Sequence, residues 1–285
     1  MKFHQPDADV FVPAPAGVTP EAALARTTHL CVAAHQDDIE IMAYAGVAAC
    51  FERADRHFTG VIVTDGAGSP RAGQFAGMTD AEMRRVRRDE QRQAAVIGRY
   101  SLQVQLAYPS AAVKQPLVPG LKADLAAIFS GCAPEVVYLH QPADKHDTHV
   151  AVFLRCLEAL RALPLERRPP RVLGCEGWRD LDWLDDAQKV ALDASPRPEL
   201  AAELVRVFDS QISGGKRYDL AAIGRRTANA TFHTAHVVDQ ATAISWAMDL
   251  TPLLHDDALS PLDFVLGHVD RFRADVAARL WQFGA

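Results

Sequence analysis

Two short polar clusters contain side chains of the kinds that bind metal ions and transfer protons. The first cluster is His35-Gln36-Asp37-Asp38, which interrupts the apolar run LCVAAHQDDIEIMAYAG at residues 30–46. The second cluster follows the run EVVYLH, and its members are Asp144, His146, Asp147 and His149. Two imidazole nitrogens and one carboxylate oxygen around an open fourth position make a catalytic zinc site. The two clusters together contain enough ligands for such a site.

The spacing of these residues suggests a division of roles. His35 and Asp38 are three residues apart and can reach one ion from a single turn, and His149 would complete the set. Asp37 would remain beside the metal, placed to take a proton from metal-bound water, whose pKa falls to about 7. His146 would stabilise an oxyanion or protonate a leaving amine. These parts describe the metal-assisted hydrolysis of an amide.

Each cluster taken alone also fits a structural role. Adjacent aspartates before a helix commonly cap it and interact with its dipole. The chain contains two similar sequences, His233 and His236 in FHTAH, and residues 255–257 in LHDD. Neither clearly follows a strand of the expected sheet, so we expect both to have no catalytic role.

Alternating strands and helices are expected to position the two clusters. Apolar runs predict strands at residues 28–34, 57–64, 102–108, 135–140 and 171–177. Helices are predicted at 38–54, 80–98, 120–130 and 149–163, the second with a capping box of Thr79 and Glu82. The chain beyond 177 is expected to be mainly helical. This order predicts an α/β fold, a mostly parallel sheet with helices on both faces and a helical C-terminal extension.

The expected topology brings the two clusters together. Ligands bind doubly wound sheets beyond the carboxyl ends of the strands, at the point where the strand order reverses. If the predicted strands follow the common order 3-2-1-4-5, the first and the fourth are neighbours at that point. The loops after Ala34 and His140 would then face each other across one crevice. His140 itself is expected to be a polar strand end.

Composition limits the class of protein. The chain has 285 residues, 49% of them hydrophobic and 23% charged, which is typical of a globular protein. Its net charge of −6 disfavours nucleic-acid binding. No signal peptide and no run of about 20 apolar residues is found, so a soluble, cytoplasmic protein is expected. The cysteines form no CxxC pair and are expected to be buried, reduced thiols; they are Cys31, Cys50, Cys132, Cys156 and Cys175.

The two clusters resemble the signature of the PIG-L (LmbE-like) family of zinc-dependent de-N-acetylases. AHQDDIE and HDTH are similar to that family's AHPDDxE and its later HPDH or HxxH. Weaker similarities extend the resemblance over about residues 28–215; they are VTDGAGS, RRDEQRQAAVIG, KVAL and SQ. The resemblance implies a Rossmann-like fold and removal of an acetyl group from N-acetylglucosamine units on a larger scaffold.

Matched residue by residue, the family pattern makes His35, Asp38 and His149 the zinc ligands. It makes Asp37 the general base, and His146 the oxyanion-stabilising or proton-donating histidine. These roles agree with those suggested by the spacing. The ligand types would also suit Fe²⁺, Co²⁺ or Ni²⁺.

Gln36 departs from the family pattern, which usually has proline at this position. Because proline fixes φ and lacks an N–H donor, glutamine predicts a looser loop with an added amide. This change is expected to affect substrate preference or the rigidity of the loop.

Three residues are candidates for substrate contact. Asp65 and the glycines after it would line a pocket, because small residues let a ligand approach the backbone. The resemblance places Arg87, paired with Glu90, near the substrate. Trp178 would either stack on a sugar ring or pack in the core.

These observations predict a metal-dependent hydrolase, with Zn²⁺ as cofactor, that removes an N-acetyl or other N-acyl group from an amino sugar or glycoconjugate. Two alternatives are an amidase acting on a non-sugar substrate and a non-catalytic sugar- or nucleotide-binding module. The expected partner is a small molecule, with a homo-oligomer left open. The expected organisation is an N-terminal extension (1–27), a catalytic domain (28–215) and a mainly helical region packed on it (216–285).

Overall fold

The computed structural model describes residues 1–13 and 17–284. Residues 14–16, which belong to the expected N-terminal extension, and Ala285 lie outside the described residues. None of the helices described is long and apolar enough to cross a membrane.

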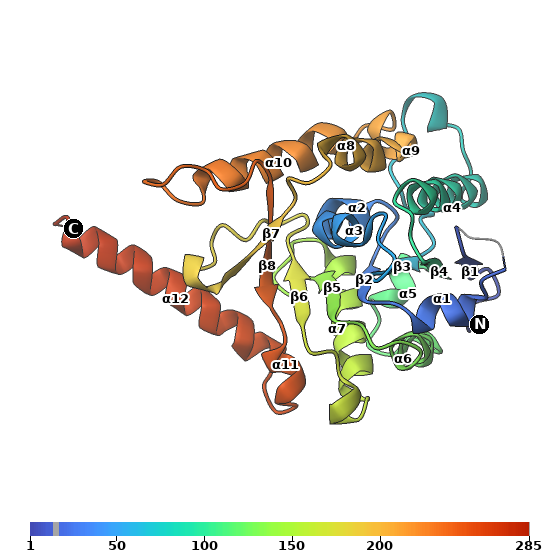
Figure 1. Ribbon diagram of the computed structural model, residues 1–285, viewed down its shortest axis with the longest axis horizontal. Helices are drawn as coiled ribbons and strands as arrows, with labels where there is room; N and C mark the ends of the chain where they lie inside the picture. The colour runs from blue at the N-terminus through green and yellow to red at the C-terminus, as the bar shows by residue number, and fades with distance from the viewer. Residues whose placement is uncertain (14–16, 285) are drawn as a thin grey trace.

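An eight-stranded sheet forms the centre of the molecule, in the order β1-β4-β3-β2-β5-β6-β8-β7 (Figure 1). Its five central strands are parallel and correspond to the five predicted ones. They are β2 (His29–Ala33), β3 (Phe58–Thr64), β4 (Leu102–Tyr108), β5 (Val136–His140) and β6 (Val172–Cys175). Their order along the sheet is the expected 3-2-1-4-5, so the predicted mostly parallel α/β fold is confirmed.

Three antiparallel strands, one next to β4 and two beyond β6, were not predicted. They are β1 (Asp9–Phe11), β7 (Lys189–Asp193) and β8 (Ile244–Asp249). β8 lies between β6 and β7 and is antiparallel to both. The chain beyond residue 177 therefore contributes two strands as well as helices. Runs this short do not distinguish a strand from a buried helical segment by periodicity alone.

Helices cover both faces of the sheet. One face carries α1 (Pro20–Ala25), α6 (Leu121–Ser130) and α7 (Asp147–Arg161), and the other carries α2 (Asp38–Met42), α3 (Tyr44–Cys50), α4 (Asp80–Ile97) and α8 (Pro198–Arg206). The predicted helix 38–54 is two helices that meet at Ala43. The capping box of Thr79 and Glu82 begins α4 as predicted.

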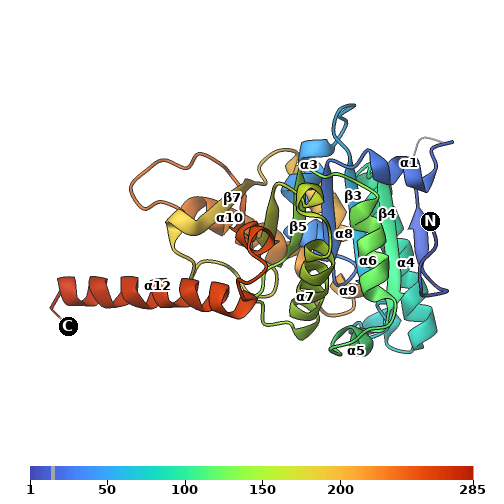
Figure 2. The same cartoon turned by 90° about the horizontal axis from the view of Figure 1, so that it is seen from below.

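The remaining helical segments connect and extend these layers. They are α5 (Ser110–Val113), α9 (Asp209–Ile212), α10 (Tyr218–Phe232), α11 (Pro252–His255), α12 (Pro261–Gln282) and the 3₁₀ turns η1 (Gly73–Phe75), η2 (Leu165–Arg167) and η3 (Asp186–Gln188). The second half of α12 extends away from the sheet (Figure 2). α10 packs against β8 and α8.

The sheet register places the two polar clusters side by side. β2 and β5 are adjacent parallel strands, with Cys31 opposite Tyr138. Both strands are buried, so each leaves the core at its carboxyl end. The first cluster follows β2, and the second follows β5.

Candidate functional site

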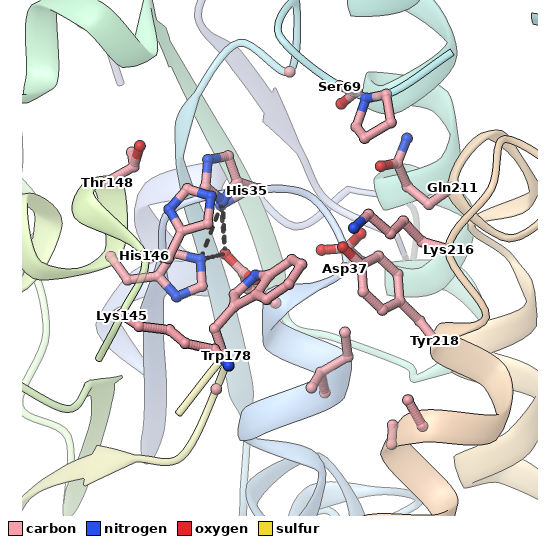
Figure 3. Close-up of a pocket in the computed structure, with 18 of the residues that line it drawn as sticks. His35, Asp37, Ser69, Lys145, His146, Thr148, Trp178, Gln211, Lys216 and Tyr218 are labelled. Carbon is pink, nitrogen blue, oxygen red and sulfur yellow. Dashed lines mark hydrogen bonds and ion pairs between the residues drawn. The ribbon is translucent and has the colours of Figure 1, made fainter. Parts of the chain in front are cut away.

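Three donor atoms from the two clusters lie at the corners of a nearly equilateral triangle, here called the donor triad. His35 Nδ1 is 3.2 Å from Asp38 Oδ2, and His149 Nε2 is 3.3 Å from both atoms (Figure 3). With bonds of about 2.0–2.1 Å at tetrahedral angles, two zinc ligands lie roughly 3.3–3.4 Å apart. The residues present therefore fit a zinc ion with one open coordination position.

His140 and His146 add further nitrogens that could bind a metal ion. Donor atoms of His35, His146 and His149 lie within 4.8 Å of one another, and so do those of Asp38, His140 and His149. His149 belongs to both groups as well as to the donor triad. It is therefore the residue around which any metal site in this cluster would be built.

The backbone at the end of β2 directs the first cluster. Asp37 has a φ of 90°, in the left-handed region that few non-glycine residues adopt. Asp38 begins α2, and its Oδ2 accepts a hydrogen bond of 2.7 Å from the backbone N–H of His35. The turn therefore points Asp38 back toward His35, while Asp37 has different partners.

Asp144, which the sequence did not single out as a site residue, orients His149. Its Oδ2 lies 3.0 Å from His149 Nδ1, leaving Nε2 directed at the donor triad. Its Oδ1 accepts from the backbone N–H groups of Lys145 at 2.6 Å and Arg179 at 3.0 Å. A carboxylate behind a ligating histidine fixes the imidazole tautomer and is a common feature of zinc sites. In the sequence, the signal for this role was the place of Asp144 in the second cluster, five residues before His149.

The charges of this buried cluster require a cation. Burial alone lowers the pKa of His149, but Asp38 and Asp144 raise it to about 9. Burial likewise raises the pKa of Asp38, whereas His149 and its hydrogen bonds hold the pKa well below the usual value. The two carboxylates are thus stabilised by a positive charge between them. A proton on His149 would supply this charge, and so would a divalent metal ion.

His140 ends β5 as expected, and it also supports the site. Its side chain is buried, and its Nε2 accepts a hydrogen bond of 2.9 Å from the backbone N–H of Ala34. Its ring stacks on that of His149 with the centroids 3.8 Å apart. Burial and the neighbouring His149 lower its pKa to about 4, so His140 is neutral. It packs against His149 and ties the two strand ends together.

Asp37 lies beside the donor triad and is paired with Arg87. Asp37 Oδ2 accepts a hydrogen bond of 3.0 Å from Arg87 Nη2. Burial raises the pKa of Asp37 to about 7, against the opposing effect of Arg87. The predicted pairing of Arg87 with Glu90 is weaker, with Nη1 3.4 Å from Glu90 Oε2. Arg87 borders the cavity described below, but its hydrogen bonds go to Asp37, Glu90, Ser210 and the backbone oxygen of Gln36.

The RxxE and SQ segments of the sequence meet behind Asp37. Glu90 accepts two hydrogen bonds of 2.7 Å from Ser210, one from its backbone N–H and one from its hydroxyl. The α9 turn is thereby fastened to α4. Two segments separated by more than a hundred residues together hold Arg87 against Asp37.

The added amide of Gln36 anchors the first cluster to the sheet. Its side chain is buried, and its Nε2 donates to the backbone oxygen of Thr64 at 3.3 Å and to Gln105 Oε1 at 3.1 Å. The amide that replaces the family's proline thus joins the loop to β3 and β4. Gly66 lies opposite this amide with a φ of 74°, in the left-handed region that favours glycine. A Cβ there would also lie 2.7 Å from Gln36 Oε1 and 3.0 Å from Arg87 Cβ.

Asp65 is placed beside the cavity and is not among the residues that line it. Its Oδ2 lies 3.0 Å from Arg84 Nε, and its Oδ1 accepts from the backbone N–H of Ala67 at 3.1 Å. The turn that Asp65 makes brings Gly66 and Ser69 to the wall of the cavity.

A cavity of about 760 Å³ opens over the donor triad. His146 packs beside His149 and near Trp178, its ring centroid 4.4 Å from that of His149 and 5.9 Å from that of Trp178. Burial and His149 lower the pKa of His146 to about 4. Figure 3 shows Trp178 between His146 on one side and Asp37 with Tyr218 on the other.

The family model of GlcNAc-PI de-N-acetylase (PIG-L) matches residues 30–160 of the chain. This segment contains both polar clusters and ends near the end of α7. No curated protein sequence matches the chain.

Solved structures match most of the chain at low sequence identity. N,N'-diacetylchitobiose deacetylase from Pyrococcus horikoshii is 15% identical with a TM-score of 0.61, over 81% of this chain and 86% of its own. GalB, the 4-carboxy-2-hydroxymuconate hydratase from Pseudomonas putida KT2440, is 17% identical with a TM-score of 0.57, over 79% and 96%. The A40926 pseudoaglycone deacetylase Dbv21 is 17% identical with a TM-score of 0.53, over 79% and 97%. At these identities the likeness is one of fold.

Proposed function

Residues 30–160 of this chain form a domain of the PIG-L family, and on that premise we propose that the protein is a metal-dependent hydrolase that removes an N-acetyl or related N-acyl group. An amino sugar or glycoconjugate is the proposed substrate, as in the deacetylases that share the fold. Because a hydratase shares the fold as well, the fold alone does not identify the reaction. The observation that carries the proposal is the donor triad with Asp37 beside it.

His35, Asp38 and His149 would hold the metal, with zinc fitting the spacing of their donor atoms. A bound divalent metal ion would polarise the acyl carbonyl and acidify the attacking water. His140 and Asp144 hold His149 in place, one by stacking and the other by its hydrogen bond to Nδ1. The ligand roles follow the family pattern and the geometry together.

Asp37 is the proposed general base. Its raised pKa of about 7 suits a carboxylate that takes a proton from water near neutral pH. Arg87 keeps it oriented and favours its charged form. Asp37 would take the proton of the attacking water, and the carbon–nitrogen bond of the amide would then break.

His146 is the proposed residue for the oxyanion or the leaving amine. It lines the cavity next to the donor triad, on the side of Trp178. Because burial and His149 lower its pKa to about 4, the neutral ring would donate an N–H hydrogen bond to the carbonyl oxygen as charge develops there. The proton that Asp37 takes from water would then pass to the departing amine. Trp178 would provide the apolar face against which a sugar ring packs.

The test is Asp37→Asn, assayed for the release of acetate and free amine from N-acetylated sugars. Loss of general-base catalysis should lower kcat by about 100- to 10,000-fold, with metal content unchanged. Asp147→Asn is the matched control, because Asp147 belongs to the second cluster but is exposed. Parent-like activity in Asp37→Asn would remove Asp37 from this role. An absence of amide hydrolysis by the metal-loaded parent across a broad panel would refute the proposed reaction.

A further inference from the structure

Lysines are concentrated at the cavity over the donor triad. The chain has only six lysines, and three of them, Lys114, Lys145 and Lys216, line this one cavity. Within the described residues, Lys189 is the only lysine with a carboxylate oxygen within 4.0 Å. The three cavity lysines are therefore free of ion pairs in a chain whose net charge is −6.

Two arginines of α10 add to the positive charge of the same wall. Arg226 is 3% exposed, and its Nη2 donates to the backbone oxygens of Glu40 and Ile41 at 2.6 and 2.9 Å. Its Nε and Nη1 have no hydrogen-bond partner among the residues described in the structure. Arg225 lines the cavity next to it and donates to the backbone oxygen of Gly177. A buried guanidinium with unused donors is costly unless a ligand or water satisfies them.

The acidic residues of the cavity offset only part of this charge, since among them Glu176 alone interacts electrostatically with Arg225 and Arg226. They are Asp37, Asp38 and Glu176. Asp37 is paired with Arg87, and Asp38 belongs to the donor triad. Glu176 Oε1 accepts from Asn229 Nδ2 at 2.6 Å and from the backbone N–H of Trp246 at 3.0 Å. Basic side chains thus outnumber acidic ones around the cavity, six to three, the reverse of the chain as a whole.

Lys216 lies near the proposed reacting groups and is separated from His146 by the ring of Trp178. Lys216 Nζ is 5.0 Å from the centroid of the Trp178 ring, and the same ring is 5.9 Å from that of His146. Figure 3 shows Lys216 beside Tyr218 and Asp37, and Lys145 on the side of His146. Lys145 and Lys216 thus lie on opposite sides of Trp178, along the cavity that opens over the donor triad.

We propose that the substrate carries an anionic group, a carboxylate or a phosphate, that binds in this cavity among the basic side chains of Lys114, Lys145, Lys216 and Arg226. Ammonium groups bind both anions as point charges, and a cavity lined by one sign of charge concentrates ligands of the other. This inference rests on the proposed function for the reacting end of the substrate, and it adds the chemistry of the other end.

The test measures binding, so that it does not depend on turnover. In an Asp37→Asn background, calorimetry at low salt would compare N-acetylglucosamine, its 6-phosphate and N-acetylmuramic acid, which carries a carboxylate. Three proteins are needed: the background itself, the variant Lys114→Met/Lys145→Met/Lys216→Met, and a charge-matched control, Lys2→Met/Lys122→Met/Arg206→Met. The control residues are exposed and lie outside the cavity lining.

At least one charged sugar should bind the background protein tenfold or more tightly than N-acetylglucosamine. That preference should disappear in the cavity variant and persist in the control. Tighter binding of the 6-phosphate would identify phosphate as the anion, and tighter binding of N-acetylmuramic acid would identify carboxylate. Equal binding of charged and neutral sugars, no binding of any, or a preference that survives in the cavity variant would overturn the proposal. Hydrolysis of neutral substrates by the parent would leave the proposed function standing in each of these cases.

Discussion

Two HxxH sequences in this chain have the same spacing and different surroundings. His146 and His149 begin α7 after the carboxyl end of β5, and His149 is buried against residues of the β2 loop. His233 and His236 follow the end of α10 and are exposed. His233 packs edge-on against Trp246, with the ring centroids 4.7 Å apart. His146 and His149 lie beside the end of the neighbouring strand β2. Among the described residues, no parallel strand ends in this way beside His233 and His236.

The aspartate pairs differ in the same way. Asp38 lies within 3.5 Å of nitrogens of three histidines. Asp257, in the similar LHDD sequence, is exposed and pairs with Arg168 at 2.7 Å. A carboxylate beside arginine is already satisfied, whereas one surrounded by imidazoles can share a metal ion with them. The two aspartate pairs have the same spacing, so their position relative to the sheet is what distinguishes them.

The largest expected effect tests this comparison directly. His35→Ala combined with His149→Ala leaves Asp38 alone in the donor triad, so bound metal should be lost. Since metal catalysis contributes several kcal/mol, activity should fall by about 1,000-fold or more. Elemental analysis of purified protein and an acetate-release assay measure the two effects.

The matched control is His233→Ala combined with His236→Ala, which should keep both metal and activity. Metal retained by the first variant, or lost by the control, would break the comparison. A parent protein that binds no metal after reconstitution would show that both histidine pairs are structural.

The next effect concerns the carboxylate behind His149. Asp144→Asn removes the negative charge that holds His149 Nδ1, and metal affinity should weaken by about 10- to 100-fold. Competition with a chromogenic chelator measures the change. Asp256→Asn is the control from the LHDD sequence, and its affinity should equal that of the parent. An unchanged affinity in Asp144→Asn would mean that stacking on His140 alone orients His149.

Much of this site could be predicted because it follows from the parallel strands. The five central strands have apolar runs long enough to recognise, and their usual order brings the loops after β2 and β5 together. The chemistry of the residues in those loops then indicates a metal. β7 and β8 could not be predicted in this way, because their pairing depends on contacts made far along the chain.

The supporting residues were harder to predict because their roles depend on side-chain direction. Asp144 and His140 have ordinary sequence contexts, and only the fold shows that both touch His149. The three cavity lysines are scattered along the sequence, and no spacing links them. Gln36 shows the same limit, since a substitution that loosens an isolated loop instead fastens this one to the sheet.

The smallest expected effect is on stability and concerns Gln36, whose amide anchors the loop of the first aspartate pair. A matching change near the second pair sharpens the comparison. Gln36→Ala leaves the backbone oxygen of Thr64 and the amide oxygen of Gln105 without the Gln36 donor, in a buried position. Losing such a buried partner should lower the free energy of unfolding by about 1–3 kcal/mol, as measured by urea denaturation. His255→Ala, an exposed change in LHDD, should stay within about 0.5 kcal/mol of the parent. Because the donor triad itself is intact, metal content should be unchanged in both variants. Equal stability of the two variants would mean that the amide of Gln36 does not anchor the first cluster, and that the turn at Asp37 holds it without help.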